Sequence, residues 1–352
     1  MNNQTERLEW LDFMKGVAIF LVVLGHVFIM DFNKRPLIAE YIYSFHMPFF
    51  FLLTGILSYK SIHKPLWNVI KRKAYTLLMP FVTVGLFYSV LYDDLHRFLF
   101  DEYHAGYWFM LSIFLTWLFF IISVKIASLI KNNLILDLAF LSIPYVLLKF
   151  LCTHVPASIC NGLSLQLTML NYRFFIIGFI LGVLIFCTVY NEKESMFRKL
   201  LEIKIPVAHK QLASDADMNK NSSVYLCFRG LLIILYMSIT ISYLRDMNWV
   251  RTLPEIVLQT LICISLLVTL KMFVQSSNKC TRIIAYVGKN SLTIYLFHYF
   301  LVRLFAIELN GMSDTYMLLF AIVLSSIIIA LTLLFTIPIR RNLFLNRIFL
   351  SK

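Results

Sequence analysis

Three polar residues lie on one side of the first apolar segment: Asp12, Lys15 and His26. Lys15 and His26 are eleven positions apart, so at 100° per residue their side chains project from almost the same helix face. They lie about 16 Å apart along the axis, roughly half the hydrocarbon thickness of a bilayer. Ile19 and Val22 continue the same stripe. An imidazole can serve as a general base or nucleophile, and an ammonium can bind an anion. The stripe therefore predicts a reaction site that faces the interior of the protein.

Each of the three residues also has a structural interpretation. Lys15 could extend to the cytoplasmic headgroups, and Asp12 could stabilise the start of a helix. His26 could be a satisfied structural histidine. Their common face favours a single site over three separate structural roles.

Other polar residues in apolar segments are candidates because a polar group inside a membrane is costly and is usually functional. His46 precedes Pro48, which kinks a helix and frees a carbonyl in the preceding turn. Arg173 is expected to bind a polar or anionic group, or to pair with an acid. The remaining candidates are Tyr295 and His298, which share one helix face at i and i+3, and the interfacial residue Trp108.

A basic cluster, Lys71-Arg72-Lys73, precedes the third predicted span. Composition alone favours a positive-inside anchor. The alternative is a cytoplasmic clamp for the phosphates of a ligand, because several donors in one place match a phosphorylated group.

Composition places the chain among membrane proteins. Of its 352 residues, 60% are hydrophobic and only 14% are charged, whereas a soluble protein has nearer a quarter charged residues. Apolar windows long enough to span a bilayer recur along the whole sequence. The net charge of +13 does not indicate nucleic acid, since the basic residues lie between the apolar spans. The first span lacks a basic n-region and a cleavage site, so we expect it to be retained.

The pattern predicts an all-α integral membrane protein with about ten transmembrane helices in one bundle. Twenty-two Lys and Arg residues lie between the spans on one side and 7 on the other, which places both termini in the cytoplasm. We expect one transmembrane domain over 7–337, a cytoplasmic loop at about 190–223 and a basic cytoplasmic tail at 338–352. The predicted spans are 12–30, 41–60, 75–92, 107–124, 134–151, 167–189, 224–243, 254–273, 291–308 and 315–337.

The six cysteines are scattered, with no Cys-x-x-Cys pair, so the sequence indicates neither a metal site nor a disulfide framework. Cys152 and Cys160 share one predicted outer loop, where they could pair in an oxidising compartment.

Several of these motifs together resemble the membrane-bound acyltransferase-3 family of integral-membrane carbohydrate O-acyltransferases. The spacing Lys15-x10-His26 is similar to its opening signature, and Phe45 to Gly55, around His46, to its second motif. The basic cluster, Trp108-Phe109 and Ser291 to His298 are similar to its later motifs, in the same order. Lysine stands at 15 where arginine is common in the family, and at 71 and 73 where Arg-x-Arg is frequent. These lysines keep the positive charge but lack the arginine fork that binds a phosphate in bidentate geometry.

The resemblance implies an acyl-coenzyme A donor, usually acetyl-coenzyme A, entering from the cytoplasm. It implies an acceptor hydroxyl on a cell-surface or lipid-linked glycan, and a multi-pass protein of the cytoplasmic (inner) membrane. We expect no metal. We expect His26 to be catalytic, with Lys15 and the basic cluster binding coenzyme A and Asp12 positioning Lys15. The acceptor side is assigned to His46, Arg173, Tyr295 and His298, with Trp108 in an orienting role.

The expected partners are membrane lipid and the glycan or lipid-linked saccharide, with no nucleic acid and with self-association left open. Some relatives carry an appended hydrolase-like domain, and without one we expect direct transfer or hand-off to a separate protein. A transporter or flippase of a glycan precursor is the alternative function, although the paired repeats common in transporters are not evident. The third possible function is that of a membrane-embedded sensor with a degenerate site.

Overall fold

The computed structural model describes residues 9–31, 37–62, 64–128, 134–190, 255–274, 279–305 and 314–350, and every regular element within them is helical. The predicted span at 224–243 and, apart from Tyr190, the predicted loop at 190–223 lie outside the described residues. The main helices are α1 (Glu9–Asp31), α2 (Leu37–Ser58), α3 (Leu66–Leu91), α5 (Trp108–Ala127), α6 (Leu134–His154), α8 (Leu165–Tyr190), α11 (Glu255–Val274), α12 (Lys279–Lys289), α13 (Ser291–Leu304) and α14 (Asp314–Arg341).

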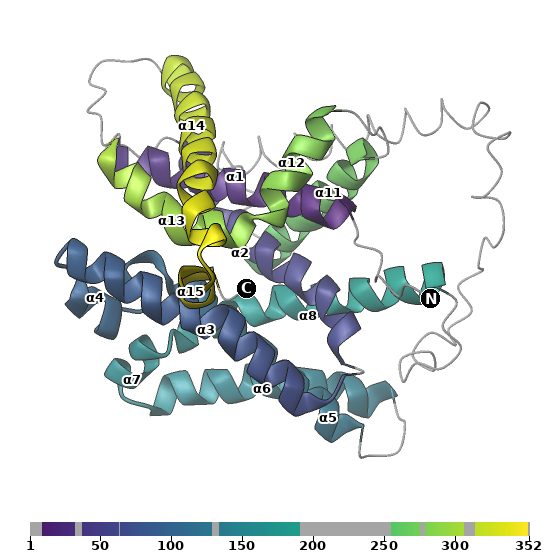
Figure 1. Ribbon diagram of the computed structural model, residues 1–352. Helices are drawn as coiled ribbons and strands as arrows, with labels where there is room; N and C mark the ends of the chain where they lie inside the picture. Colours follow the sequence, from purple (N-terminus) through teal and green to yellow (C-terminus); the bar gives the residue numbers. More distant parts are fainter. Residues whose placement is uncertain are drawn as a thin grey trace, which may run out of the picture.

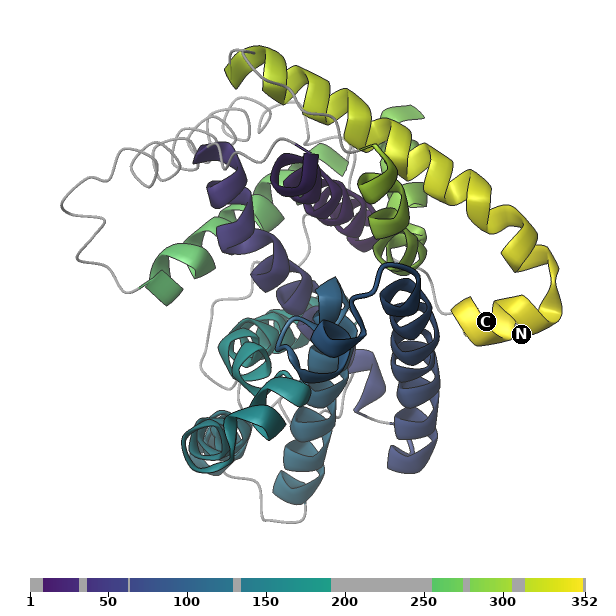
Figure 2. The same ribbon diagram turned by 90° about the vertical axis from the view of Figure 1, so that its left-hand side faces the viewer.

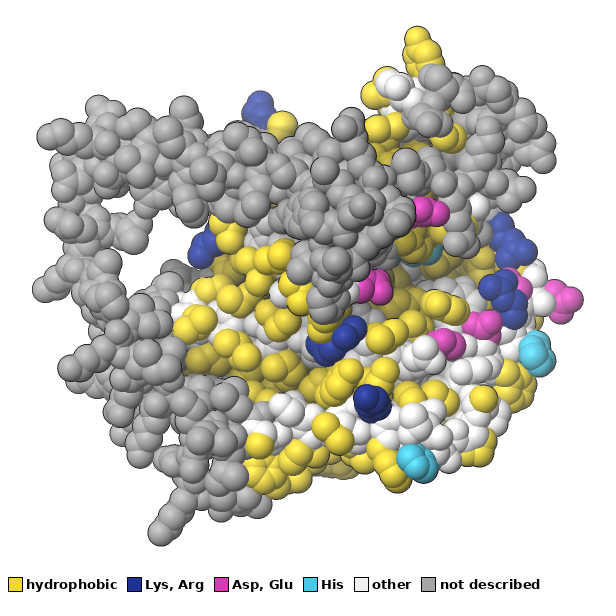
Figure 3. Space-filling model, turned by 180° about the vertical axis from the view of Figure 1, so that it is seen from behind, with side chains coloured by type: hydrophobic (Ala, Val, Ile, Leu, Met, Phe, Trp, Pro, Cys, Tyr) yellow, Lys and Arg dark blue, Asp and Glu magenta, His cyan; other side chains and the backbone are white. Residues whose placement is uncertain are grey.

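Six helices of the described part are long and apolar enough to cross a membrane: α1, α2, α3, α5, α8 and α14. A bilayer core offers no water to backbone groups, so a spanning segment must satisfy them internally, as a helix does. Figure 3 shows many hydrophobic side chains on the described part of one face, with charged side chains scattered among them. The prediction of an all-helical multi-pass membrane protein is therefore confirmed. The count of ten and the orientation of the termini stay predictions.

Helix α2 lies at the centre of the bundle. It packs against α1 on one side and α8 on the other, with α11 to α14 grouped around α1, and α3 to α8 forming the other side (Figure 1). Helix α14 runs along the outside of the molecule (Figure 2). It continues through the predicted domain boundary at 337, and residues 342–350 then return to α3, where Tyr75 and Thr83 donate hydrogen bonds to the Arg347 and Ile348 carbonyls.

Aromatic side chains fill the contact between α2, α5 and α8. Phe49 and Phe51 of α2 are fully buried, so they pack inside the bundle rather than facing lipid. Phe120 of α5 contacts Phe175 and Phe179 of α8, with ring centroids 5.1 and 4.6 Å apart. Edge-to-face rings of this kind add stabilisation beyond the area they bury.

Glycines permit the closest crossing of these helices. A Cβ added to Gly55 of α2 would meet the carbonyl oxygen of Phe175 in α8, and one added to Gly178 of α8 would meet that of Leu52 in α2. Small residues allow membrane helices to approach at backbone distance, which supplies the packing that association in lipid requires. Helices α1 and α12 cross in the same way at Gly16 and Gly288.

We predict that Gly55→Ala destabilises the protein by about 1–3 kcal/mol, because the added methyl meets backbone that cannot move aside cheaply. Gly162→Ala is the matched control. Its Cβ would have its nearest neighbour at 3.6 Å, an ordinary contact. Thermal unfolding of the purified protein in detergent should show a lower midpoint for the first variant only. Equal midpoints would contradict the close crossing.

Candidate active site

The His26 side chain of α1 is held between two tyrosines from other helices. The Tyr43 hydroxyl of α2 lies 2.9 Å from His26 Nδ1, and the Tyr299 hydroxyl of α13 lies 2.9 Å from His26 Nε2. A neutral imidazole has one donor and one acceptor nitrogen. One tyrosine oxygen therefore accepts a hydrogen bond while the other hydroxyl donates one, and the ring is fixed in position between three helices.

Two further histidines belong to the same cluster. His298 of α13 is fully buried, and its ring centroid lies 5.3 Å from that of His26. Its Nδ1 is 2.9 and 2.8 Å from the Ile294 and Tyr295 carbonyl oxygens, so Nδ1 carries the proton. Nε2 of His298 is then an acceptor, and it has no hydrogen-bond partner among the described residues. His46 Nδ1 likewise lies 2.7 Å from the carbonyl oxygen of Ile42 in its own helix.

A cavity of about 930 Å³ opens beside His26. Five of the predicted site residues line it, contributed by α1, α2, α5, α8 and α13. Tyr43 and Tyr299 line it too, so the hydrogen-bonded imidazole is accessible to a ligand in the cavity. The predicted residues on its wall are His26, His46, Trp108, Arg173 and Tyr295.

A second cavity, of about 230 Å³, lies further toward the start of α1. Lys15, Ile19 and Val22 line it, so the stripe predicted along α1 faces a cavity over this length. Val22 borders both cavities together with Met47 and Tyr295. The two cavities therefore adjoin at these three side chains, with Lys15 beyond one end and His26 beyond the other.

The residues predicted to bind coenzyme A fall into two groups. Lys15 and Lys73 line the smaller cavity, and Lys15 Nζ lies 3.1 Å from Asp12 Oδ1 one turn earlier in α1. Lys71 and Arg72 are exposed and do not line it; the Lys71 ammonium lies over the Trp67 ring, 5.2 Å from its centroid. The structure thus places one lysine of the basic cluster beside Lys15 and leaves its two neighbours on the surface.

A strained turn braces the tyrosines of α13. His104, Ala105 and Gly106 all have positive φ, at 47°, 52° and 101°. The Tyr295 hydroxyl donates to the Gly106 carbonyl at 2.8 Å, and a Cβ at Gly106 would meet the Tyr299 ring. His104 is buried beneath the turn with Nδ1 2.6 Å from the Phe98 carbonyl oxygen, and burial lowers its pKa. Such backbone persists only where the surroundings impose it, and it is common at active sites.

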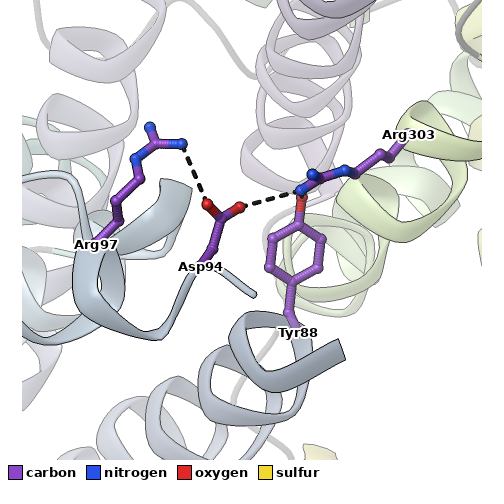
Figure 4. Close-up of polar contacts among 4 residues, drawn as sticks. All are labelled: Tyr88, Asp94, Arg97 and Arg303. Carbon is purple, nitrogen blue, oxygen red and sulfur yellow. Dashed lines mark hydrogen bonds and ion pairs between the residues drawn. The ribbon is translucent and has the colours of Figure 1, made fainter. Parts of the chain in front are cut away.

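Three of the residues that line the large cavity, Asp94, Arg97 and Arg303, form a charged network. Asp94 Oδ2 lies 3.1 Å from Arg303 of α13, and Asp94 Oδ1 lies 3.5 Å from Arg97 of α4 (Leu95–Phe100) (Figure 4). The same Arg303 nitrogen donates to the Tyr88 hydroxyl at 3.4 Å, and its guanidinium lies 4.3 Å from the Tyr92 ring centroid.

Sequence reasoning missed Tyr43, Tyr299 and this charged network. Tyr299 directly follows His298, and Tyr43 precedes His46 by three positions. Their closeness in sequence to these candidate histidines could have marked both tyrosines as candidate site residues. Asp94 and Arg303 are 209 positions apart, and nothing in their spacing links them.

Within the described residues, no group of three or more His, Cys, Asp or Glu side chains could hold a metal ion. Cys152 and Cys160 are free thiols with sulfur atoms 3.6 Å apart.

The comparisons with known proteins assign the chain to one family. The family model described as an acyltransferase domain matches residues 8–340, nearly the whole chain. The searches of curated proteins and of solved structures returned no match. The resemblance seen in the motifs is therefore confirmed: the chain belongs to the acyltransferase 3 family and is a multi-pass membrane acyltransferase.

Proposed function

We propose that the protein transfers an acyl group, in the first instance acetyl, from acyl-coenzyme A to a hydroxyl of a cell-surface or lipid-linked glycan. The observation that carries the proposal is the His26 imidazole, held by two tyrosines at a large cavity that adjoins a second cavity lined by lysines. The transport alternative receives no support from the acyltransferase family match.

The donor is proposed to enter at the smaller cavity. Lys15 and Lys73 would bind phosphates of coenzyme A through charge-assisted hydrogen bonds. The thin pantetheine arm would follow Ile19 and Val22 along α1 and bring the thioester to His26. Lys71 and Arg72, which are exposed, would attract the nucleotide end from the cytoplasm.

His26 would then act as a general base. The acceptor hydroxyl replaces one tyrosine at the unprotonated ring nitrogen and gives its proton to that nitrogen as its oxygen attacks the thioester carbonyl. The carbon–sulfur bond breaks, and the coenzyme A thiolate takes the proton from the imidazolium. The tyrosine at the other nitrogen keeps the ring in the required tautomer, as the partner of a catalytic histidine does.

The acceptor is proposed to occupy the large cavity. Its volume of about 930 Å³ is at the upper end of the range typical of ligand sites, which suits a saccharide. His46, Arg173 and Tyr295 offer polar groups on its walls, and Trp108 offers an aromatic face. His298, whose Nε2 has no hydrogen-bond partner among the described residues, does not line the cavity. We place the protein in the cytoplasmic membrane, with the acceptor approaching from the outer side.

We predict that His26→Gln lowers acyl transfer about 10²–10⁴-fold, since glutamine keeps hydrogen-bonding capacity but cannot take the proton. The measurement is ester formation on the glycan, by mass spectrometry, in cells and with purified protein. His154→Gln, an exposed histidine at the end of α6, is the control and should retain activity. Substantial activity in the His26 variant would rule out the catalytic role.

We predict that Lys15→Gln and Lys73→Gln each weaken coenzyme A binding about 10-fold or more, as expected for losing a charge-assisted hydrogen bond. Lys71→Gln should have a smaller effect, because this side chain lies outside the cavity. Titration calorimetry of the protein in nanodiscs would rank the three. An equal effect of all three would favour general attraction over a defined phosphate site.

We predict that Val22→Phe blocks the junction of the two cavities. Acyl transfer should fall at least 10-fold while coenzyme A still binds, because the phosphate-binding lysines are untouched. Leu21→Phe is the control, since Leu21 is next to Val22 and lines neither cavity. If transfer survives in a folded Val22 variant, the thioester does not pass this point.

A further inference from the structure

The large cavity contains more positive than negative charge. Among the residues that line it are three arginines, Arg97, Arg173 and Arg303, and two carboxylates, Asp94 and Glu255. A cavity for a neutral saccharide does not require this excess, because hydroxyls can be bound by neutral donors and acceptors. The arrangement of each arginine shows which of them is available to a ligand.

Arg303 and Arg97 are already neutralised in part by the same acid. Both contact Asp94, and Arg303 also donates to the Tyr88 hydroxyl (Figure 4). The Arg303 guanidinium lies over the face of Tyr92 as well. These contacts join α13 to the segment between α3 and α4. Arg303 thus has a structural role at the edge of the cavity.

Among the described residues, Arg173 has no such counter-ion. It forms no ion pair with a carboxylate of the described residues. Its Nε donates to the Leu170 carbonyl of its own helix at 3.1 Å, and its guanidinium lies 5.9 Å from the Phe174 ring centroid. A guanidinium has five N–H donors, so its forked end remains available for bidentate binding.

The position of Arg173 relates this charge to the reaction. It lines the same cavity as His46 and Asn171, and His26 borders that cavity from α1. A ligand whose anion binds Arg173 would therefore have its neighbouring hydroxyls inside the cavity that contains the His26 imidazole. Planar guanidinium forks match carboxylates and phosphates.

We propose that the acceptor is acidic, and that Arg173 binds a carboxylate or phosphate carried by the sugar that is acylated or by its neighbour. This inference rests on the proposed function, because it names the class of acceptor for that site. The carboxylate of a uronic acid and the phosphate that joins a sugar to a lipid carrier share the required chemistry.

Binding to three small saccharides tests the proposal without any acyl donor. The protein in nanodiscs of zwitterionic lipid is titrated with methyl β-D-glucuronide, glucose 1-phosphate and methyl β-D-glucoside, and affinity is measured by saturation-transfer NMR. At least one anionic probe should bind about 10-fold or more tightly than the neutral glucoside. Preference for the glucuronide identifies a sugar carboxylate, and preference for the phosphate identifies the carrier linkage.

Arg173→Gln should remove this preference, and Arg173→Lys should restore part of it, since the charge returns without the fork. Lys149→Gln is the control, because Lys149 is exposed on α6 and does not line the cavity. Equal binding of all three probes, no binding of either anion, or an unchanged preference in Arg173→Gln would each overturn the proposal.

The same variants separate this inference from the proposed function. With purified enzyme, Arg173→Gln should raise the KM for an anionic acceptor and leave coenzyme A affinity unchanged. Failure of the binding preference with His26-dependent acyl transfer intact overturns the acidic acceptor alone. An intact preference together with no effect of His26→Gln on transfer overturns the catalytic role while leaving the anion site in place.

Discussion

The hydrogen bonds between the His26 ring and the hydroxyls of Tyr43 and Tyr299 determine how the rest of the site is built. An imidazole within a membrane protein must have both nitrogens satisfied or incur the cost of desolvation. Here the partners come from α2 and α13, so three helices have to meet at one ring. Gly25, next to His26 in α1, leaves room for the Tyr43 ring of α2, because an added Cβ there would lie 3.0 Å from a ring carbon of Tyr43.

The strained turn at residues 104–106 adds a second constraint on the same tyrosines. Gly106 accepts a hydrogen bond from Tyr295 and lies against the Tyr299 ring, so the turn limits how far α13 can move from His26. A side chain at 106 would collide with Tyr299, which explains why the residue with the largest positive φ in the turn is glycine. The turn therefore stabilises the proposed catalytic arrangement from outside the spanning helices.

Much of the fold and part of the site could be predicted because they depend on local sequence. The structure describes nine of the ten predicted spans in whole or in part, and each of the nine is helical. The 100° periodicity correctly placed Lys15, Ile19, Val22 and His26 along adjoining cavities. Tyr43, Tyr299 and the Asp94–Arg303 pair depend instead on which helices pack together. Periodicity within one helix contains no information about its neighbours, so these contacts required the structure.

The charges of the two cavities differ in a way that agrees with two-sided access. At the α1 start, the smaller cavity has lysines, which are compact, strongly hydrated charges suited to a ligand that enters from water and leaves again. The larger cavity has arginines, one of them fixed by Asp94, the Tyr88 hydroxyl and the Tyr92 ring, and guanidinium forks suit oriented binding of a carboxylate or phosphate. His26 lies where a thioester from one side and a hydroxyl from the other could meet. In the proposed function the two ligands meet across Val22, Met47 and Tyr295, the side chains that line both cavities, so that one histidine can serve both.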